Sequence, residues 1–136
     1  MIDSTNFILA PIVGFICAGT LKFFINSIKL KRLAFSEIGL GNFPSTHNCI
    51  VSTTFFTILL TEGLYSPLTA LSLSLCFIVT IDSLDLRKKI ETHAVLLREI
   101  SNKTDILRTK VGHTIPEVAG GYFLGFVLAL MIIYLG

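Results

Sequence analysis

The chain has 136 residues, of which 52% are hydrophobic and 15% are charged, and its mean hydropathy is +0.77. Soluble domains carry roughly 25% charged residues, and a chain of this length could not bury so much apolar surface in a soluble core. The composition therefore excludes an ordinary soluble domain and predicts a single membrane domain over residues 1–136.

The net charge of +2 is informative mainly through its placement, because all 11 Lys and Arg residues fall within Lys22–Arg32 and Arg87–Lys110. Neither stretch contains an aromatic stacking platform, so we expect no nucleic-acid partner. Cys17, Cys49 and Cys76 lie in apolar segments without a CxxC pair. We interpret them as small buried thiols.

The first apolar segment runs from about Thr5 to Phe24, which is long enough to cross a hydrocarbon core of roughly 30 Å. Pro11 and Gly14 lie inside it and are tolerated in membrane helices. Met1–Asn6 contains no basic residue, so we expect this segment to be retained rather than cleaved as a signal peptide.

Three further apolar segments follow, at about His47–Leu60, Pro67–Ile81 and Ile115–Leu135. The first two are short and are separated by a turn at Glu62–Pro67, so they could form a re-entrant pair. We favour two tilted or partly interfacial spans. The sequence then predicts about four transmembrane helices.

The long connection before the last segment predicts a helix of its own, from about Leu86 to Ser101. Apolar side chains recur in it at helical spacing and the charged side chains occupy other faces. Such a helix suits the cytoplasmic interface, although a solvated charged connector fits the same pattern. The expected fold is therefore all-α integral membrane, with about four transmembrane helices plus a cytoplasmic amphipathic helix.

Four spans and the positive-inside rule place both basic loops in the cytoplasm and both termini outside, for which we expect a bacterial inner membrane. Two faces of small residues suit close helix contact, one at Gly121 and Gly125 and one at Gly14 and Ala18. These faces would serve packing within the chain or within a homo-oligomer equally well.

The Pro44–His47 stretch precedes an apolar helix, where Ser45 or Thr46 is a natural N-cap. The free N–H groups and the positive end of the helix dipole would form a cradle for an anion, with His47 in the first turn. For this tetrapeptide taken alone, a plain helix cap with an interfacial histidine is the interpretation that we favour.

The Gly112–Glu117 stretch also opens a helix, with Pro116 in its first turn. His113 and Glu117 share a face if the helix includes both. The carboxylate could then hold one imidazole nitrogen and leave the other free, as in nucleophile and base constellations. A structural polar clasp is the alternative interpretation.

Considered together, these stretches indicate chemistry on phosphate. Lys22, Lys29 and Arg87 are expected near helix ends on the same side as His47 and His113. One histidine could attack phosphorus, the other could protonate the departing oxygen, and the cations could stabilise the equatorial oxygens. This chemistry requires no metal.

These motifs resemble those of the type-2 phosphatidic acid phosphatase superfamily, which includes the vanadium haloperoxidases. Its motifs are Lys-x6-Arg-Pro, Pro-Ser-Gly-His and Ser-Arg-x5-His-x3-Asp. The second resembles Pro44–His47, with Thr46 in place of Gly, and the end of the third resembles His113 followed at the same interval by Glu117.

The resemblance is closer to the divergent branch of that superfamily, small membrane proteins related to acid phosphatases and vanadium-dependent haloperoxidases. The pattern of this branch is a Lys in the first helix, then Gly-x-Pro-Ser-Ser-His, Asp-x4-Arg-Arg and Gly-His-x-Pro-x-Glu-Val. The corresponding positions here are Lys22, Asn42–His47, Asp82–Lys88 and Gly112–Val118, which together extend over nearly the whole chain.

The resemblance implies that His113 is the nucleophile that forms a phosphohistidine, that Glu117 orients it and that His47 is the general acid. It implies no cofactor. The residues expected to bind phosphate are Lys22, Lys29, Ser45, Thr46, Arg87 and Lys88.

The chain also departs from the superfamily motifs. Lys29 and Leu30 stand where Arg and Pro are expected, and lysine lacks the bidentate geometry of arginine. Leu107 stands where the third motif has Arg, and we infer that Arg87 supplies the missing guanidinium. Glu117 in place of Asp lengthens the orienting arm.

Asp82 and Asp85 end the third apolar segment, where acidic side chains call for a partner. They are weak candidates for binding a divalent ion. Ion pairing with Lys22 and Arg87 is the interpretation that we favour.

The expected function is a membrane phosphatase whose substrate and partner is a phosphorylated lipid in the surrounding membrane, with a site that faces the cytoplasm. The candidate substrates are phosphatidic acid, phosphatidylglycerophosphate and polyprenyl phosphate derivatives. Two alternatives stay open at this point. One is a non-catalytic scaffold that binds anionic lipid headgroups, and the other is a metal-dependent enzyme that uses Asp82, Asp85 and Glu117.

Overall fold

The computed structural model describes residues 4–33, 42–100 and 110–135, and all regular elements in these ranges are helical. The prediction of an all-α protein is therefore confirmed for the described residues. The elements are α1 (Ser4–Leu30), α2 (Thr46–Glu62), α3 (Pro67–Ile81), η2 (Asp82–Leu86), α4 (Arg87–Ile100) and α5 (Ile115–Leu135). Position 107, which entered the motif comparison, lies outside the described residues.

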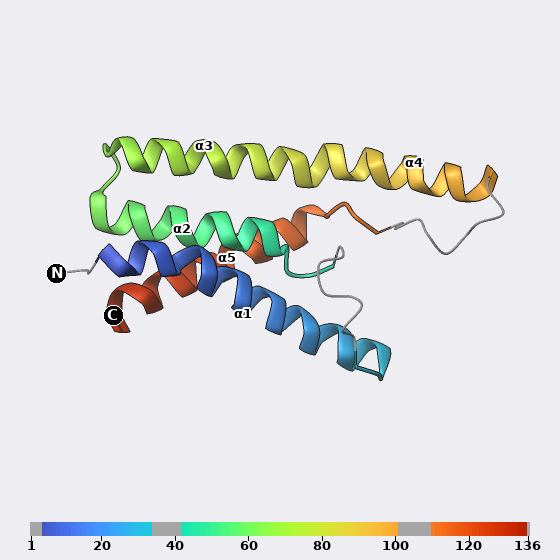
Figure 1. Ribbon diagram of the computed structural model, residues 1–136, viewed down its shortest axis with the longest axis horizontal. Coiled ribbons are helices and arrows are strands. Elements are labelled where there is room, and N and C mark those ends of the chain that lie inside the picture. The colour runs from blue at the N-terminus through green and yellow to red at the C-terminus, as the bar shows by residue number, and fades with distance from the viewer. Residues whose placement is uncertain (1–3, 34–41, 101–109, 136) are drawn as a thin grey trace.

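Helix α2 is the central element, because it packs against α1, α3 and α5 (Figure 1). Its buried face is largely polar, and the hydroxyls of Ser52, Thr53 and Thr57 bond to the helix's own backbone. Thr53 donates to the carbonyl of Cys49 at 2.7 Å, and Thr57 donates to that of Thr53 at 2.8 Å. Such back-bonding lets small polar side chains lie between helices without unpaired hydroxyls.

Within the described residues, three helical stretches are long and apolar enough to cross a membrane: Phe7–Leu30, Pro67–Ile100 and Ile115–Leu135. Their outward faces carry large exposed apolar side chains such as Phe15, Phe77 and Phe123. These are the features of a membrane protein. The predicted count of four spans is not confirmed, because α2 has only 17 residues and is enclosed by the other helices.

Helix α4 has nearly the predicted bounds, but it is not a separate helix. It continues α3 through the π-helical turn η2 as a single rod (Figure 1). At the end of this turn, the N–H of Arg87 donates to the carbonyl of Asp82, five residues back. The expected amphipathic helix along the interface is therefore the far half of a 34-residue helix.

The predicted small-residue faces lie where helices come closest. Gly121 and Gly125 of α5 face α2, and Gly14 of α1 faces α2 from the other side. Ala18 belongs to the small apolar core, together with Cys49 and Leu128. The three cysteines are free thiols, of which Cys49 and Cys76 are buried and Cys17 is partly buried.

We expect Gly125→Ala to destabilise the protein by about 1–3 kcal/mol, because the added methyl group would overlap the Ser52 side chain and crowd the α2 backbone. Gly19→Ala is the matched control, since a methyl group there meets no atom within 4 Å. Equilibrium unfolding in detergent would measure both variants. Equal stability of the two would contradict the observed helix contact.

Candidate active site

The polar stretches meet at one end of the bundle, opposite the start of α1, the end of α5 and the α2–α3 turn (Figure 1). Two backbone hydrogen bonds join them. The N–H of Ser45 donates to the carbonyl of Glu117 at 2.9 Å, and the N–H of His113 donates to that of Ser83 at 3.1 Å. The predicted meeting of the two histidine stretches is therefore observed.

Asn48 is buried and links the Ser45 stretch to the end of α3 and to η2, and the sequence analysis missed it. Its amide nitrogen donates to the hydroxyls of Ser45 at 2.9 Å and Ser83 at 3.0 Å. Its amide oxygen accepts from Thr80 at 3.0 Å. The sequence does offer a signal for it, because Asn48 lies in an apolar segment directly after His47. A buried amide there needs hydrogen-bond partners on several sides.

The start of α2 differs from the expected cap. Ser45 occupies the N-cap position in an extended conformation, but its hydroxyl makes no capping hydrogen bond and instead accepts from Asn48. The hydroxyl of Thr46 is buried and has no hydrogen-bond partner in the part of the chain that the structure describes. An unpaired buried hydroxyl at a helix start is available to a ligand.

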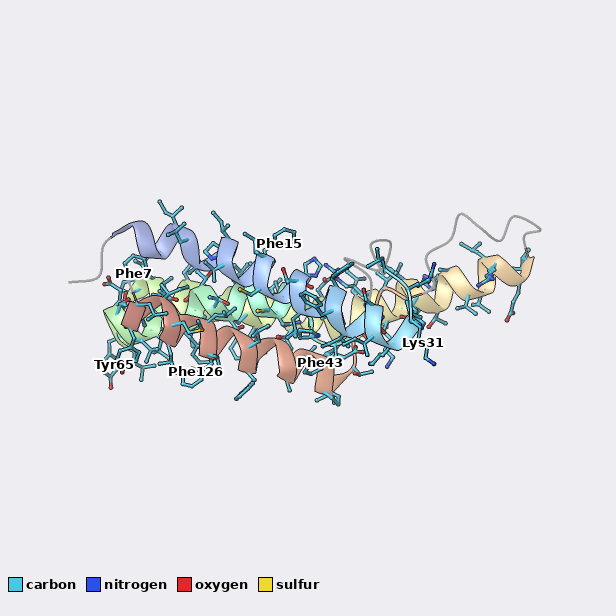
Figure 2. The ribbon with its side chains drawn as sticks, turned by 90° about the horizontal axis from the view of Figure 1, so that it is seen from below. Phe7, Phe15, Lys31, Phe43, Tyr65 and Phe126 are labelled. Atoms are coloured by element: carbon cyan, nitrogen blue, oxygen red, sulfur yellow. The ribbon has the colours of Figure 1, made fainter. Side chains whose placement is uncertain are left out.

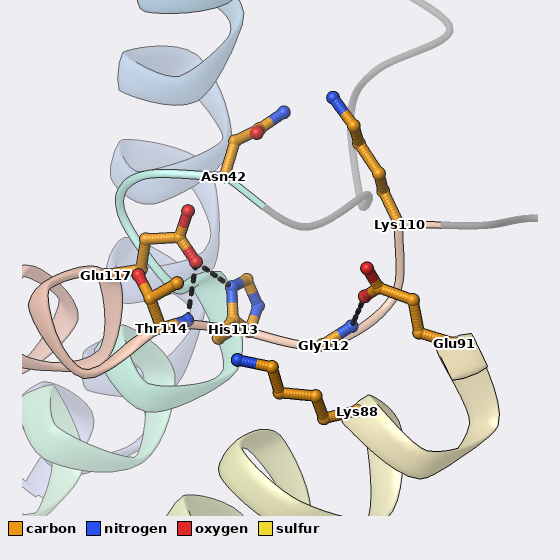
Figure 3. Close-up of a pocket in the computed structure, with 8 residues that line it drawn as sticks. All are labelled: Asn42, Lys88, Glu91, Lys110, Gly112, His113, Thr114 and Glu117. Carbon is orange, nitrogen blue, oxygen red and sulfur yellow. Dashed lines mark hydrogen bonds and ion pairs between the residues drawn. The ribbon is translucent and has the colours of Figure 1, made fainter.

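His113 is 4% exposed, and its Nδ1 lies 3.3 Å from Oε2 of Glu117 (Figure 3). The same carboxylate oxygen accepts from the N–H of Thr114 at 2.8 Å. Helix α5 begins only at Ile115, so His113 precedes the helix instead of sharing its face. The pair forms because Glu117 reaches back to the helix start, as the acidic member of a capping box does.

A cleft of about 180 Å³ opens beside His113. The loop of residues 111–114 carries His113 and is called the histidine loop below. Figure 3 shows Lys88 extending from α4 toward His113, with Asn42 and Lys110 on the other side of this loop. The cleft is lined by Asn42, Lys88, Glu91, Lys110, Gly112, His113, Thr114 and Glu117. Lys88 was predicted as a phosphate ligand, whereas Lys110, Asn42 and Glu91 were not.

Glu91 holds the approach to His113 in place. Its Oε2 accepts from the N–H groups of Gly112 at 3.1 Å and of Val111 at 3.3 Å. Gly112 lies so close to α4 that a β-carbon there would be 3.0 Å from Cα of Lys88. Helical spacing predicted that Glu91 lies on a charged face of the helix. Nothing in the neighbouring sequence predicted that its carboxylate would bond to the backbone of Val111 and Gly112.

Lys22 lies deeper than predicted. The sequence placed it near the end of the first helix, but α1 continues to Leu30 and leaves Lys22 only 1% exposed. Its charge still belongs to the site, because it interacts electrostatically with Glu117 and His113. Lys29 is exposed and does not line the cleft at His113.

The acidic residues at the end of α3 are engaged by cations. Asp82 pairs with Arg87 and Asp85 with Lys89, so the predicted Asp82–Arg87 pairing is confirmed. Arg87 nevertheless acts electrostatically on His113. Across the described ranges, no three His, Cys, Asp or Glu side chains converge in the manner of a metal site.

His47 lies in the first turn of α2 with an exposed side chain, and it is not among the residues that line the cleft at His113. It interacts electrostatically with Arg87, His113 and Lys22. The structure thus brings His47 close to the other charged groups, on the outer side of the site.

The model of the Divergent PAP2 family matches residues 4–128. The chain belongs to the divergent PAP2 family. No curated protein and no solved structure matches it. Membership of the divergent PAP2 family relates the chain to a phosphatase-related superfamily and confirms the branch that the motifs indicated.

The environment of His113 in this divergent PAP2 protein favours the neutral imidazole. Burial lowers the pKa of His113 from its ordinary value of 6.5, and the charge of Lys22 lowers it further. Glu117 opposes both effects by its hydrogen bond and its charge. His113 is therefore neutral at pH 7, with Glu117 positioned to hold its Nδ1 proton.

We expect Glu117→Gln to lower the pKa of His113, because the variant removes the negative charge that raises it. The glutamine oxygen can still accept from the Thr114 amide, so the helix start is preserved. An NMR titration of labelled histidines would measure the shift. Glu91→Gln is the matched control, since it neutralises a carboxylate of the same cleft that does not act on His113. A higher pKa in Glu117→Gln would contradict the assigned contact.

Proposed function

We propose that the protein is a membrane phosphatase that hydrolyses a phosphomonoester or a diphosphate of a lipid. Phosphatidic acid, phosphatidylglycerophosphate and polyprenyl phosphate derivatives are the candidate substrates. The observation that carries the proposal is the His113–Glu117 pair, whose neutral imidazole lies beside a cleft lined by Lys88 and Lys110. Membership of the divergent PAP2 family supports it.

In the proposed reaction, Nε2 of His113 attacks phosphorus while Glu117 holds Nδ1 and its proton. The P–Nε2 bond forms and the bond from phosphorus to the lipid oxygen breaks. His47 in its protonated form donates a proton to that oxygen, and its exposed position at the start of α2 suits a leaving group that extends out of the cleft. Burial and the charges of Arg87, His113 and Lys22 lower the pKa of His47, so this step is favoured at a pH low enough to protonate it. Water then attacks the phosphohistidine and releases phosphate.

Positive charge would stabilise the transferring phosphoryl group. Lys88 and Lys110 line the cleft, and Lys22 and Arg87 add positive potential at His113. The unpaired hydroxyl of Thr46 supplies a further donor at the start of α2. All the groups needed for the two steps are therefore side chains of the chain itself.

The proposed location is a bacterial inner membrane, with the site on the cytoplasmic side and both termini outside. The described basic residues support this orientation. Lys29, Lys31 and Arg32 lie at the end of α1, and Arg87 and Lys88 lie at the start of α4, all toward the end that carries the site. Basic residues accumulate on the cytoplasmic side of membrane proteins.

We expect His113→Ala to lower phosphate release by at least about a thousandfold, since it removes the proposed nucleophile. The assay uses detergent-purified protein with a panel of lipid phosphates in the presence of chelator. His93→Ala is the matched control, because His93 lies on the exposed part of α4 and lines no part of the cleft. Full turnover by His113→Ala would rule out the assigned nucleophile.

We expect His47→Ala to lower turnover of lipid phosphates by about 10²–10⁴-fold, the usual contribution of a general acid. The loss should be much smaller for p-nitrophenyl phosphate, because its leaving group departs without a proton. Rates on the two substrate types would be compared in the same preparation. An equal loss on both would assign His47 to phosphate binding or to folding instead.

A second candidate function is a non-catalytic scaffold that binds anionic lipid headgroups. Two observations favour it: Arg87 is paired with Asp82, and His47 does not line the cleft at His113. Headgroup binding by wild-type protein that releases no phosphate from any lipid of the panel would support the scaffold. Recovery of turnover on adding Mg²⁺ would instead support a metal-dependent enzyme.

A further inference from the structure

A second cleft, of about 210 Å³, lies next to the cleft at His113. Asn42 and Lys110 line both clefts, and both side chains are seen beyond the histidine loop in Figure 3. Asn26, Lys29 and Leu30 of α1 complete the second cleft. The two clefts therefore adjoin at Asn42 and Lys110.

The described side chains that line the second cleft suit an anion. They include two lysines and two amides, and none of them is a carboxylate. Lys29 and Lys110 form no ion pair within the described ranges of the chain. No described carboxylate therefore neutralises their positive charge, as expected where a ligand brings the negative charge.

Asn26 gives an independent indication of a ligand. Asn26 is only 4% exposed, yet its amide nitrogen has no hydrogen-bond partner among the described residues. Leaving a buried donor unpaired costs free energy, so such a group calls for a partner from outside the chain. Figure 2 shows Lys31, which directly follows α1, at the end of the bundle opposite Phe7 and Tyr65.

Helix α1 links the two clefts with one polar face. Lys22, Asn26 and Lys29 recur at helical spacing, so they lie along the same side of α1. Lys22 acts electrostatically on His113 and Glu117, whereas Asn26 and Lys29 line the second cleft. In this mainly apolar helix, the polar face extends from the proposed reaction centre at His113 to the second cleft.

We propose that the second cleft is a subsite for a second phosphate-type anion, held by Lys29, Lys110 and the Asn26 amide. The inference rests on the proposed function, because it assumes that the first anion is the phosphoryl group attacked by His113. The preferred substrates are then lipids whose headgroup carries two phosphoryl groups. Free phosphate shares the same chemistry and is the other source of the second anion.

The test compares phosphatidylglycerophosphate, which has a phosphodiester and a phosphomonoester, with phosphatidic acid, which has the phosphomonoester alone. We expect Lys29→Gln to lower kcat/KM for phosphatidylglycerophosphate about three- to tenfold more than for phosphatidic acid, since one charge-assisted contact is lost. Lys31→Gln is the matched control, because Lys31 is exposed two positions along and lines neither cleft. It should leave the ratio between the two lipids unchanged.

Asn26→Leu separates a ligand contact from a structural role. Removal of the unpaired buried amide should raise the melting temperature of the ligand-free protein, because leucine has similar size and no unpaired donor. The same variant should weaken selection of phosphatidylglycerophosphate over phosphatidic acid. A fall in melting temperature with unchanged selection would overturn the role of Asn26 as a ligand contact.

Inorganic phosphate, titrated as an inhibitor, distinguishes the two sources of the anion. Weaker phosphate inhibition in Lys29→Gln, with equal losses on both lipids, would show that the cleft takes free phosphate and would overturn the proposed substrate class. No effect of Lys29→Gln beyond that of Lys31→Gln, on either lipid or on inhibition, would overturn the subsite.

Binding to the His113→Ala protein separates this proposal from the proposed function. Stabilisation by each lipid in mixed micelles would be measured with and without Lys29→Gln in that background. If wild-type protein releases no phosphate but Lys29→Gln still reduces the preference for phosphatidylglycerophosphate, the catalytic proposal fails and the subsite stands. If turnover is intact and that preference is absent, the subsite fails alone.

Discussion

The close approach of α2 and α5 is the constraint on which the rest of the structure depends. A β-carbon at Gly121 would lie only 2.6 Å from the carbonyl oxygen of Ser45, so only glycine permits this spacing. The same approach allows the backbone hydrogen bond from Ser45 to Glu117. It therefore places the His47 stretch and the His113 stretch, which are far apart in the chain, at one end of the bundle.

Local patterns predicted much of this arrangement. The bounds of α3 and α5 match the predicted segments, because long apolar runs between turn residues leave little choice of secondary structure. The glycine faces were also predicted, since they follow from side-chain size. The His113–Glu117 contact was predicted too, but it forms because Glu117 reaches back to the helix start and not because the two residues share a helix face. The motifs indicated the divergent PAP2 family, and the family comparison confirmed it.

The features that the sequence did not predict depend on contacts between distant segments. The depth of Lys22 follows from α1 extending beyond its apolar part, which hydropathy does not detect. Asn48 links three segments, and Glu91 holds a loop that lies some twenty residues further along the chain. Each of these residues looks like an ordinary polar side chain until the fold supplies its partners.

The π-helical turn η2 sets the rotational phase of the rod that contains it. Each residue of an α-helix advances the side-chain direction by about 100°, so a turn with one extra residue rotates everything beyond it by about that amount. Ser83 lies inside η2 and accepts from the His113 backbone, whereas Lys88 and Glu91 lie just beyond it. Without the wider turn, the α4 residues that meet the histidine loop would point elsewhere around the helix.

The rod's 34 residues would extend about 50 Å, which exceeds a hydrocarbon core of roughly 30 Å. Helix α4, the part of the rod beyond η2, can therefore project out of the hydrocarbon core, at the depth where lipid headgroups lie.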